Sequence, residues 1–277
     1  MNGLVLHAQN TFIKKRCIHD NFLYAQRVIQ LLHRKKKPAL FIKLDISKAF
    51  DSIGWTFLLE VMQALGFSTK WRDWVSVLLG TASSKVLVDG QPTRGIKHAR
   101  GLRQGDPLSP LLFILAIDLL QRIIEVAAHN VLKPILPKSA QLRCSLYADD
   151  AANFSDPSAC ELPRLYKILT FFGECSGLKI NILKMEIYLI RLDNAAVPQL
   201  LQNFPRKICK FPGKYLGLPL HIRKLRKIEV QPLLDKIGAR LPGWKGKLLS
   251  ASGRETLVKT VLSSQPIYHM IVFPKQK

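Results

Sequence analysis

Residues 41–51 read FIKLDISKAFD, and the architecture of the chain is predicted outward from this stretch. Every second residue from Leu40 to Ile46 is a leucine or an isoleucine. A period of two is typical of a β-strand that buries one of its faces. Asp45 shares the other, less apolar face with Phe41 and Lys43, so we expect it at the end of a half-buried strand.

Two more carboxylates are expected at the tip of a hairpin. Residues 142–148 and 151–154 are short β-like runs, separated only by Asp149 and Asp150. Adjacent carboxylates repel each other, and this turn lacks the glycine that tight turns prefer, so turn stability does not explain them. Three carboxylates at strand ends have the oxygen ligands that two magnesium ions require for nucleotidyl transfer. On spacing alone, solvated turn aspartates are an equal alternative.

The rest of the chain alternates helices with turns. Asp20 or Asn21 is expected to cap a helix that ends in the basic run 34–37. Asp89 and Gly90 suit a type I′ hairpin turn. A longer helix is expected at 111–126, with Ser109 as its N-cap and Pro110 at its first position. Further helices at 55–65, 71–78 and 162–172, and a strand at 186–190, indicate an α+β fold.

Charge indicates a polyanionic partner. The 277 residues include 42 Lys and Arg against 19 Asp and Glu, a net charge of +23. Beyond residue 205, sixteen Lys and Arg face three acidic residues, so over half of the excess lies in that last quarter. Neutralising phosphates releases condensed counterions, which favours nucleic acid as the partner. A ribosomal-type protein and a membrane-surface protein are the alternatives.

Cysteine spacing and hydropathy bear on the compartment. The five cysteines form no C-x-x-C pair, which favours neither a disulfide framework nor a zinc site. Residues 1–12 lack the apolar core of a signal peptide. The longest apolar run, 111–117, stops at Asp118 and is far shorter than a membrane span. We therefore expect no membrane partner and a nuclear or cytoplasmic, reduced location.

Five segments, in order, carry a resemblance to a known family. They are FIKLDISKAFD (41–51), GLRQGDPLSP (101–110), YADD (147–150), SGLKIN (176–181) followed by Lys184, and KYLGLPL (214–220). They resemble motifs A, B, C and D and the primer-grip segment of reverse transcriptases. The resemblance is strongest to the enzymes of non-LTR (LINE-type) retrotransposons found in plant genomes. Any one of these motifs alone would be a weak signal.

The resemblance implies an RNA-directed DNA polymerase that uses two Mg²⁺ ions. Asp45 and Asp149 would bind the metal ions with help from the backbone carbonyl of Ile46, and Asp150 would complete the acidic cluster. The partners implied are an RNA template, a DNA primer or RNA–DNA hybrid, and deoxynucleoside triphosphates. Reaction of the primer 3′-hydroxyl with a deoxynucleotide would extend the DNA.

Further site residues follow from the same resemblance, each with a plainer alternative. Phe50 would stack under the sugar and exclude a 2′-hydroxyl, or it is a core residue facing Trp55. Gln104 and Gly105 would let the backbone approach the incoming nucleotide and the template base, or they only lead into a helix. Lys184 would protonate the leaving pyrophosphate or neutralise its charge, or it is a solvated surface lysine. The primer grip is assigned to Tyr215, Leu216 and Gly217.

The implied fold is a polymerase palm, an antiparallel sheet packed on helices. Residues 1–38 would be a remnant of truncated fingers, 39–205 the palm with motifs A to D, and 206–277 the primer grip with a basic, mainly helical, thumb-like part. Departures from the family pattern at Lys15, Leu183, Met185 and Ser252 affect the base of the fingers, motif D and the thumb. They leave the three aspartates intact.

Three other interpretations remain open at this point. One is a catalytically inactive relative that serves as an RNA-binding or splicing module, and a second is a non-functional remnant of an element. Truncation of the fingers favours these two, whereas the intact aspartates favour the enzyme. An RNA-dependent RNA polymerase is the third, but it would place a polar residue where Phe50 stands.

Overall fold

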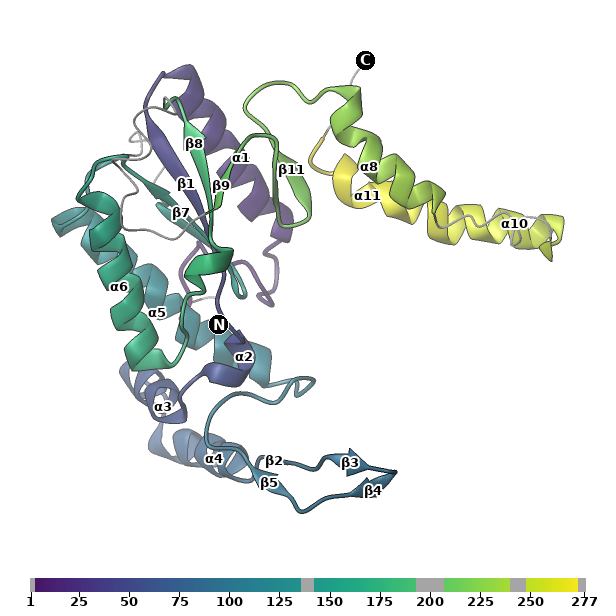
Figure 1. Cartoon of the computed structure of the whole chain (residues 1–277). Helices are drawn as coiled ribbons and strands as arrows, with labels where there is room; N and C mark the ends of the chain where they lie inside the picture. The colour runs from purple at the N-terminus through teal and green to yellow at the C-terminus, as the bar shows by residue number, and fades with distance from the viewer. Residues whose placement is uncertain (1–2, 136–141, 193–206, 240–247, 274–277) are drawn as a thin grey trace.

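A computed structural model describes residues 3–135, 142–192, 207–239 and 248–273. Its centre is a five-stranded sheet in the order β6-β7-β1-β8-β9 (Figure 1). The strands are β1 (Ala39–Leu44), β6 (Cys144–Tyr147), β7 (Asp150–Ser155), β8 (Glu186–Ile190) and β9 (Lys207–Cys209). All neighbours run antiparallel except β8 and β9, which are parallel. The antiparallel palm sheet expected from the sequence is thus confirmed.

Helices cover one face of this sheet. Ile42 of β1 packs in a core with Phe113 and Phe172. The helices that contribute to this core are α2 (Ala49–Ser52), α3 (Trp55–Ala64), α4 (Thr69–Gly80), α5 (Ser109–Asn130) and α6 (Glu161–Ser176). Burying this apolar face is the main favourable contribution to the fold.

The opposite face of the sheet is also buried, which corrects the expectation of a half-buried strand. Phe41 is fully buried in a second core with Phe22 and Tyr215. This core is formed by α1 (Ile18–Arg34) and by the hairpin of β10 (Gly213–Tyr215) and β11 (Leu218–Leu220). An alternating pattern cannot reveal that distant segments will cover the second face.

A β-arm extends from α4, away from the sheet (Figure 1). It contains β2 (Ser83–Ser84), β3 (Leu87–Val88), β4 (Gln91–Pro92) and β5 (Ile96–Lys97), paired as β2 with β5 and β3 with β4. At its tip Asp89 and Gly90 have φ values of 48° and 78°. Positive φ at both central residues is required by a type I′ turn, so this prediction is confirmed.

The C-terminal part is helical and projects from the body in Figure 1. It comprises α8 (Lys227–Gly238), α10 (Ala251–Leu257), the π-helical turn η3 (Val258–Leu262) and α11 (Ser264–Met270). None of the residues of α8 or α10 is buried. The boundary expected at residue 205 falls outside the described residues.

Two helix starts differ from the sequence prediction. The first helix has Cys17 at its N-cap, and Asp20 lies inside the first turn, where its carboxylate accepts a hydrogen bond from the Cys17 amide at 3.3 Å. The fifth helix has Leu108 at its N-cap, and the Leu108 amide donates a hydrogen bond to Asp106 Oδ1 at 2.9 Å. Ser109 is therefore the first helical residue and not the cap. Among the described residues no helix is both long and apolar enough to span a membrane.

Candidate active site

The sheet brings the motif A and motif C aspartates to the same end of adjacent strands. Leu44, the last residue of β1, is paired with Ala151 of β7. One residue beyond this pair lie Asp45 on the first strand and Asp150 on the second. Two carboxylates more than a hundred positions apart in the sequence are thus placed opposite each other.

The hairpin turn is displaced by one residue from its expected position. Tyr147 pairs with Asp150, so the two loop residues are Ala148 and Asp149, and Asp150 opens β7. Ala148 has φ +52°, in the left-handed region that favours glycine. The sequence therefore placed Asp149 at the tip correctly, whereas Asp150 belongs to the strand.

Charge repulsion is evident at this site. Burial, then the neighbouring charge of Asp149, raise the pKa of Asp150 above its usual range. Asp45 raises this pKa further, and Lys43 opposes the shift. Lys43 was not predicted as a site residue, although its place on the same strand face as Asp45 indicated that it would lie near the carboxylates. Lys43 also forms an ion pair with Glu186 of β8 at 2.7 Å.

The motif D segment lies directly against Asp45. The backbone carbonyl of Asp45 accepts a hydrogen bond from the Asn181 amide at 2.7 Å, and Ile46 forms a β-bridge with Ile180. Lys184 ends the 3₁₀ turn η1 (Ile182–Lys184), and its Nζ is 4.0 Å from Asp45 Oδ2. Lys184 is therefore beside the carboxylates, although both side chains are largely exposed.

The three aspartates fit a magnesium site in their donor chemistry. Carboxylate oxygens are the ligands that Mg²⁺ prefers. Burial first, and then the charges of Asp149 and Asp45, raise the pKa of Asp150, and a bound cation would offset the part of this shift that comes from the neighbouring carboxylates. As the side chains stand in the described ranges, no three of His, Cys, Asp or Glu converge closely enough to hold a metal ion. Asp45 points instead toward Lys184.

The motif B loop is held against α2. A Cβ on Gly101, at φ +84°, would lie 2.7 Å from the carbonyl oxygen of Asp51, so only glycine allows this approach. The Gln104 amide donates to Asp51 Oδ1 at 3.2 Å. Gly105 has φ +90°, and nothing lies within 4 Å of the position that a Cβ would take there, so its backbone stands beside open space.

Phe50 has a packing partner that the sequence did not suggest. Its ring stacks on Phe113 of α5, with 4.6 Å between centroids and 19° between planes. Trp55, the neighbour considered from the sequence, donates its indole N–H to the Gly101 carbonyl at 2.7 Å. Phe50 is only partly buried, so an edge remains accessible. Its proposed contact with the sugar stays a prediction.

The segment expected to form the primer grip makes a tight hairpin beside the β6–β7 hairpin. Leu216 and Gly217 form its turn, with φ of 49° and 78°. Tyr215 is buried, and its hydroxyl donates to Ser145 Oγ of β6 at 3.3 Å. The Tyr268 hydroxyl of α11 donates to the Leu216 carbonyl at 2.6 Å. The turn is therefore anchored from both the sheet and the C-terminal helices.

A groove of about 390 Å³ separates the two hairpins. Tyr147 and Asp150 line it from the β6–β7 hairpin, and Leu216 and Gly217 from the β10–β11 hairpin. Lys43 and Lys214 add positive charge to its wall. Asp150 and the turn of Leu216 and Gly217 thus face a common space whose wall carries both charged and apolar side chains.

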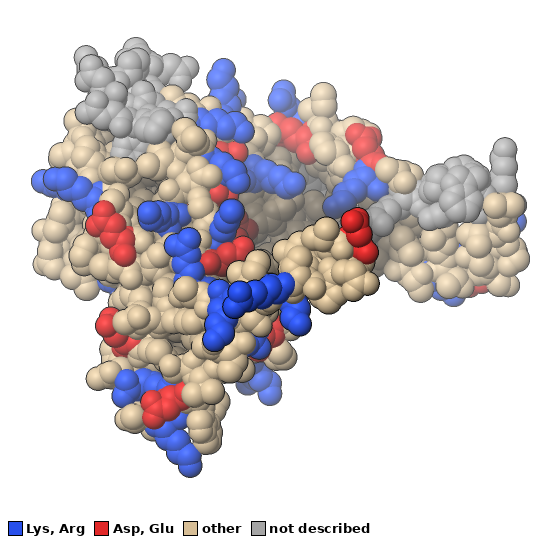
Figure 2. Space-filling model, turned by 60° about the horizontal axis from the view of Figure 1, so that its bottom comes forward, with Lys and Arg blue, Asp and Glu red and all other residues tan. Residues whose placement is uncertain are grey.

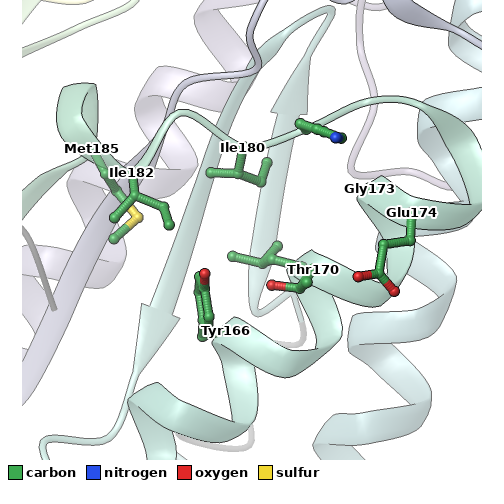
Figure 3. A pocket seen from close by; sticks show the side chains of 9 residues that line it. Tyr166, Thr170, Gly173, Glu174, Ile180, Ile182 and Met185 are labelled. Carbon is green, nitrogen blue, oxygen red and sulfur yellow. The ribbon is translucent and has the colours of Figure 1, made fainter. Parts of the chain in front are cut away.

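A smaller pocket, of about 220 Å³, lies between α6 and the motif D segment (Figure 3). Tyr166, Thr170 and Glu174 line it from the helix, and Ile182 and Met185 from the segment. None of the three candidate aspartates lines this pocket. It lies behind the segment that carries Lys184 and is separate from the acidic strand ends.

Comparison with known proteins agrees with this geometry. The family model described as "Reverse transcriptase (RNA-dependent DNA polymerase)" matches residues 3–220. The transposon TX1 149 kDa protein of Xenopus laevis is 26% identical over 275 residues, which are 96% of this chain and 20% of that protein. The Pol polyprotein of the retrotransposable element R2DM of Drosophila melanogaster is 29% identical, over 95% of this chain and 25% of its own length. The chain thus spans about a quarter or less of these two relatives.

Solved structures show the same fold. A telomerase from Candida tropicalis, solved with a fragment of telomeric RNA, superposes with a TM-score of 0.54 at 13% identity. The match covers 95% of this chain and 43% of the telomerase. Together with the sheet order and the five motifs, these matches show that the chain belongs to the reverse transcriptase family and is similar to the enzymes of non-LTR retrotransposons.

Proposed function

We propose that this chain is the catalytic region of an RNA-directed DNA polymerase from a LINE-type retrotransposon. The observation that carries the proposal is the strand register that places Asp45 opposite Asp150 beside the Asp149 turn. The reaction would join a deoxynucleotide to the 3′-hydroxyl of a primer paired with an RNA template. We place this activity in the nucleus or the cytoplasm.

Asp45, Asp149 and Asp150, with the carbonyl of Ile46, would hold two Mg²⁺ ions. Bound magnesium supplies activation of the attacking hydroxyl and stabilisation of the leaving pyrophosphate. Lys184, beside Asp45, would neutralise charge on the pyrophosphate or give it a proton. This role requires Lys184 to exchange its carboxylate neighbour for a phosphate.

The remaining residues would bind and orient the substrates. The open backbone at Gly105, next to Gln104, is suited to close approach of a nucleotide. Phe50 would lie under the sugar of the incoming deoxynucleotide. Tyr215, Leu216 and Gly217 would hold the primer end across the groove from Asp150.

Primer extension tests the proposal directly. Purified protein, magnesium, a poly-rA template and an oligo-dT primer should yield extended DNA when dTTP is added. Extension that requires both template and magnesium is the expected result. Normal hybrid binding without extension, under conditions where a known reverse transcriptase is active, would favour the inactive RNA-binding module instead.

Binding to RNA–DNA hybrid should depend strongly on salt and weakly on sequence. Lys and Arg are spread over the face shown in Figure 2, with Asp and Glu among them, and the whole chain carries a net charge of +23. Affinity is expected to fall by at least about tenfold between roughly 50 and 200 mM salt, because phosphate contacts release counterions. Fluorescence anisotropy with two unrelated hybrid sequences measures both dependences. Affinity that does not change with salt would contradict this prediction.

Replacing Phe50 with Ala should admit ribonucleotides. The space now filled by the ring would accept a 2′-hydroxyl, and discrimination should fall by roughly tenfold to a hundredfold, the usual limit for steric selection. The ratio of kcat/KM for dTTP and UTP measures this. Phe57→Ala is the matched control, because Phe57 packs in the same core against Phe172. A ratio that changes equally in both variants would assign Phe50 to the core alone.

A further inference from the structure

Gln9 is a fully buried glutamine that lies against the catalytic hairpin. It forms a parallel β-bridge with Leu146, near the end of β6. Its backbone carbonyl accepts a hydrogen bond from the Arg16 guanidinium at 2.5 Å, and the same group donates to the Leu6 carbonyl at 2.6 Å. The loop that carries Gln9 is therefore closed on itself and fixed to the sheet.

The side-chain oxygen of Gln9 reaches the turn that carries Asp149. Gln9 Oε1 accepts hydrogen bonds from the amides of Thr11 at 3.1 Å and Ala148 at 3.3 Å. Both partners are N–H donors, so only the carbonyl end of the amide can face them, and this fixes the orientation of the group. Gln9 is thus the side chain that binds the backbone of the residue preceding Asp149.

Two features indicate that the hydrogen bond between Gln9 and the Ala148 amide has a role besides stabilising the fold. Gln9 Nε2 is buried and has no hydrogen-bond partner within the described ranges, an arrangement that lowers the stability of the fold. Ala148 holds a left-handed φ of +52°, which persists only where surrounding structure enforces it. The Gln9 amide, whose Nε2 lacks a partner, is thus hydrogen-bonded through its oxygen to the strained residue Ala148, which precedes the candidate metal ligand Asp149.

We propose that Gln9 is a positioning residue that holds the Ala148–Asp149 turn in the conformation needed for catalysis. The proposal rests on the polymerase function proposed above. The amide of Gln9 acts through the Ala148 backbone, which sets where the Asp149 carboxylate stands relative to Asp45 and Asp150.

Asn21 connects the loop of Gln9 to the residues that hold the primer-grip hairpin. Its Nδ2 donates to the Ala8 carbonyl at 3.1 Å and to Ser145 Oγ at 2.8 Å. Ser145 Oγ also accepts the hydroxyl of Tyr215, which precedes the primer-grip turn. The loop of Gln9, the catalytic hairpin and the primer-grip hairpin therefore share one set of buried hydrogen bonds.

Replacing Gln9 with Met tests the proposal, because Met keeps the volume and removes the acceptor. Hydrogen exchange at the Ala148 amide should become about fivefold to tenfold faster, the effect of losing one hydrogen bond. Single-turnover extension should slow by at least as much, while hybrid affinity stays unchanged.

Gln26→Met is the matched control. Gln26 is also buried, and its amide bonds the backbone of His221 twice, at 2.6 and 3.0 Å, away from the Ala148 turn. It should lose similar thermal stability with normal exchange at Ala148. Equal exchange at Ala148 in the two Met variants would overturn the proposal, as would fast exchange with an unchanged extension rate. An inactive parent protein would refute the polymerase function, and the exchange comparison would then decide by itself whether Gln9 holds the turn.

Discussion

Replacing Asp149 with Asn is expected to abolish primer extension while hybrid binding stays nearly intact. The change keeps the size of the side chain and removes one negative oxygen from the cluster with Asp45 and Asp150. Losing an electrostatic contact of this kind lowers rates by about a hundredfold to a thousandfold or more. Binding should persist because hybrid affinity comes mainly from Lys and Arg contacts with phosphates.

The matched control for this change is Asp89→Asn. Asp89 also lies in a hairpin turn, at φ +48°, but it is exposed at the tip of the β-arm. Asparagine tolerates left-handed backbone as well as aspartate does, so the control should fold and extend primers normally. Measuring primer-extension rates and hybrid affinities of both variants tests whether the loss of extension is specific to Asp149. Extension by the Asp149→Asn protein at the parental rate would show that the catalytic assignment is wrong.

The largest expected effect on stability is that of Gly177→Ala. Gly177 ends α6 with φ +80°, and a Cβ there would lie 2.3 Å from the carbonyl oxygen of Ser52. The next turn of chain leads to the segment that bonds Asp45. Left-handed backbone alone costs alanine about 1 kcal/mol. The clash should add about 1–3 kcal/mol more.

Gly66→Ala separates these two costs. Gly66 has nearly the same φ, +82°, yet nothing lies within 4 Å of its Cβ position. Only the conformational cost applies there, so its thermal midpoint should drop by a few degrees and that of Gly177→Ala by several times as much. Thermal unfolding followed by circular dichroism measures both. Equal drops would show that the close approach of α6 to Ser52 contributes nothing.

Local rules predicted much of the fold. The alternation in residues 40–46 predicted β1, and the Asp89-Gly90 pair predicted the type I′ turn at the tip of the β-arm. Both features depend only on residues that are neighbours in the sequence. The turn between β6 and β7 was predicted one residue too late in the sequence, because a left-handed alanine is not expected in a tight turn. Ala148 adopts that conformation where a distant glutamine binds its amide.

The candidate site shows the same division. The motif residues Asp45 and Asp149 stand out in the sequence, and the strands that flank them were predicted. Gln9 begins a stretch, 9–21, that shares the family resemblance, but a single glutamine in a loop gave no indication of its contact with the Ala148 amide. The contact between Lys184 and Asp45 likewise depends on a β-bridge formed across the fold.

The central position of β1 has a consequence for how the chain reaches its native state. Phe41 of β1 pairs with Phe154 of β7 on one side and with Tyr188 of β8 on the other. Both of these strands leave the ribosome long after β1 does. Closing such long loops lowers the entropy of the chain before strand pairing provides any stabilising contacts, and this makes folding slow. Until then β1 exposes two unpaired edges and an apolar surface, the conditions under which nascent chains aggregate and chaperones are required.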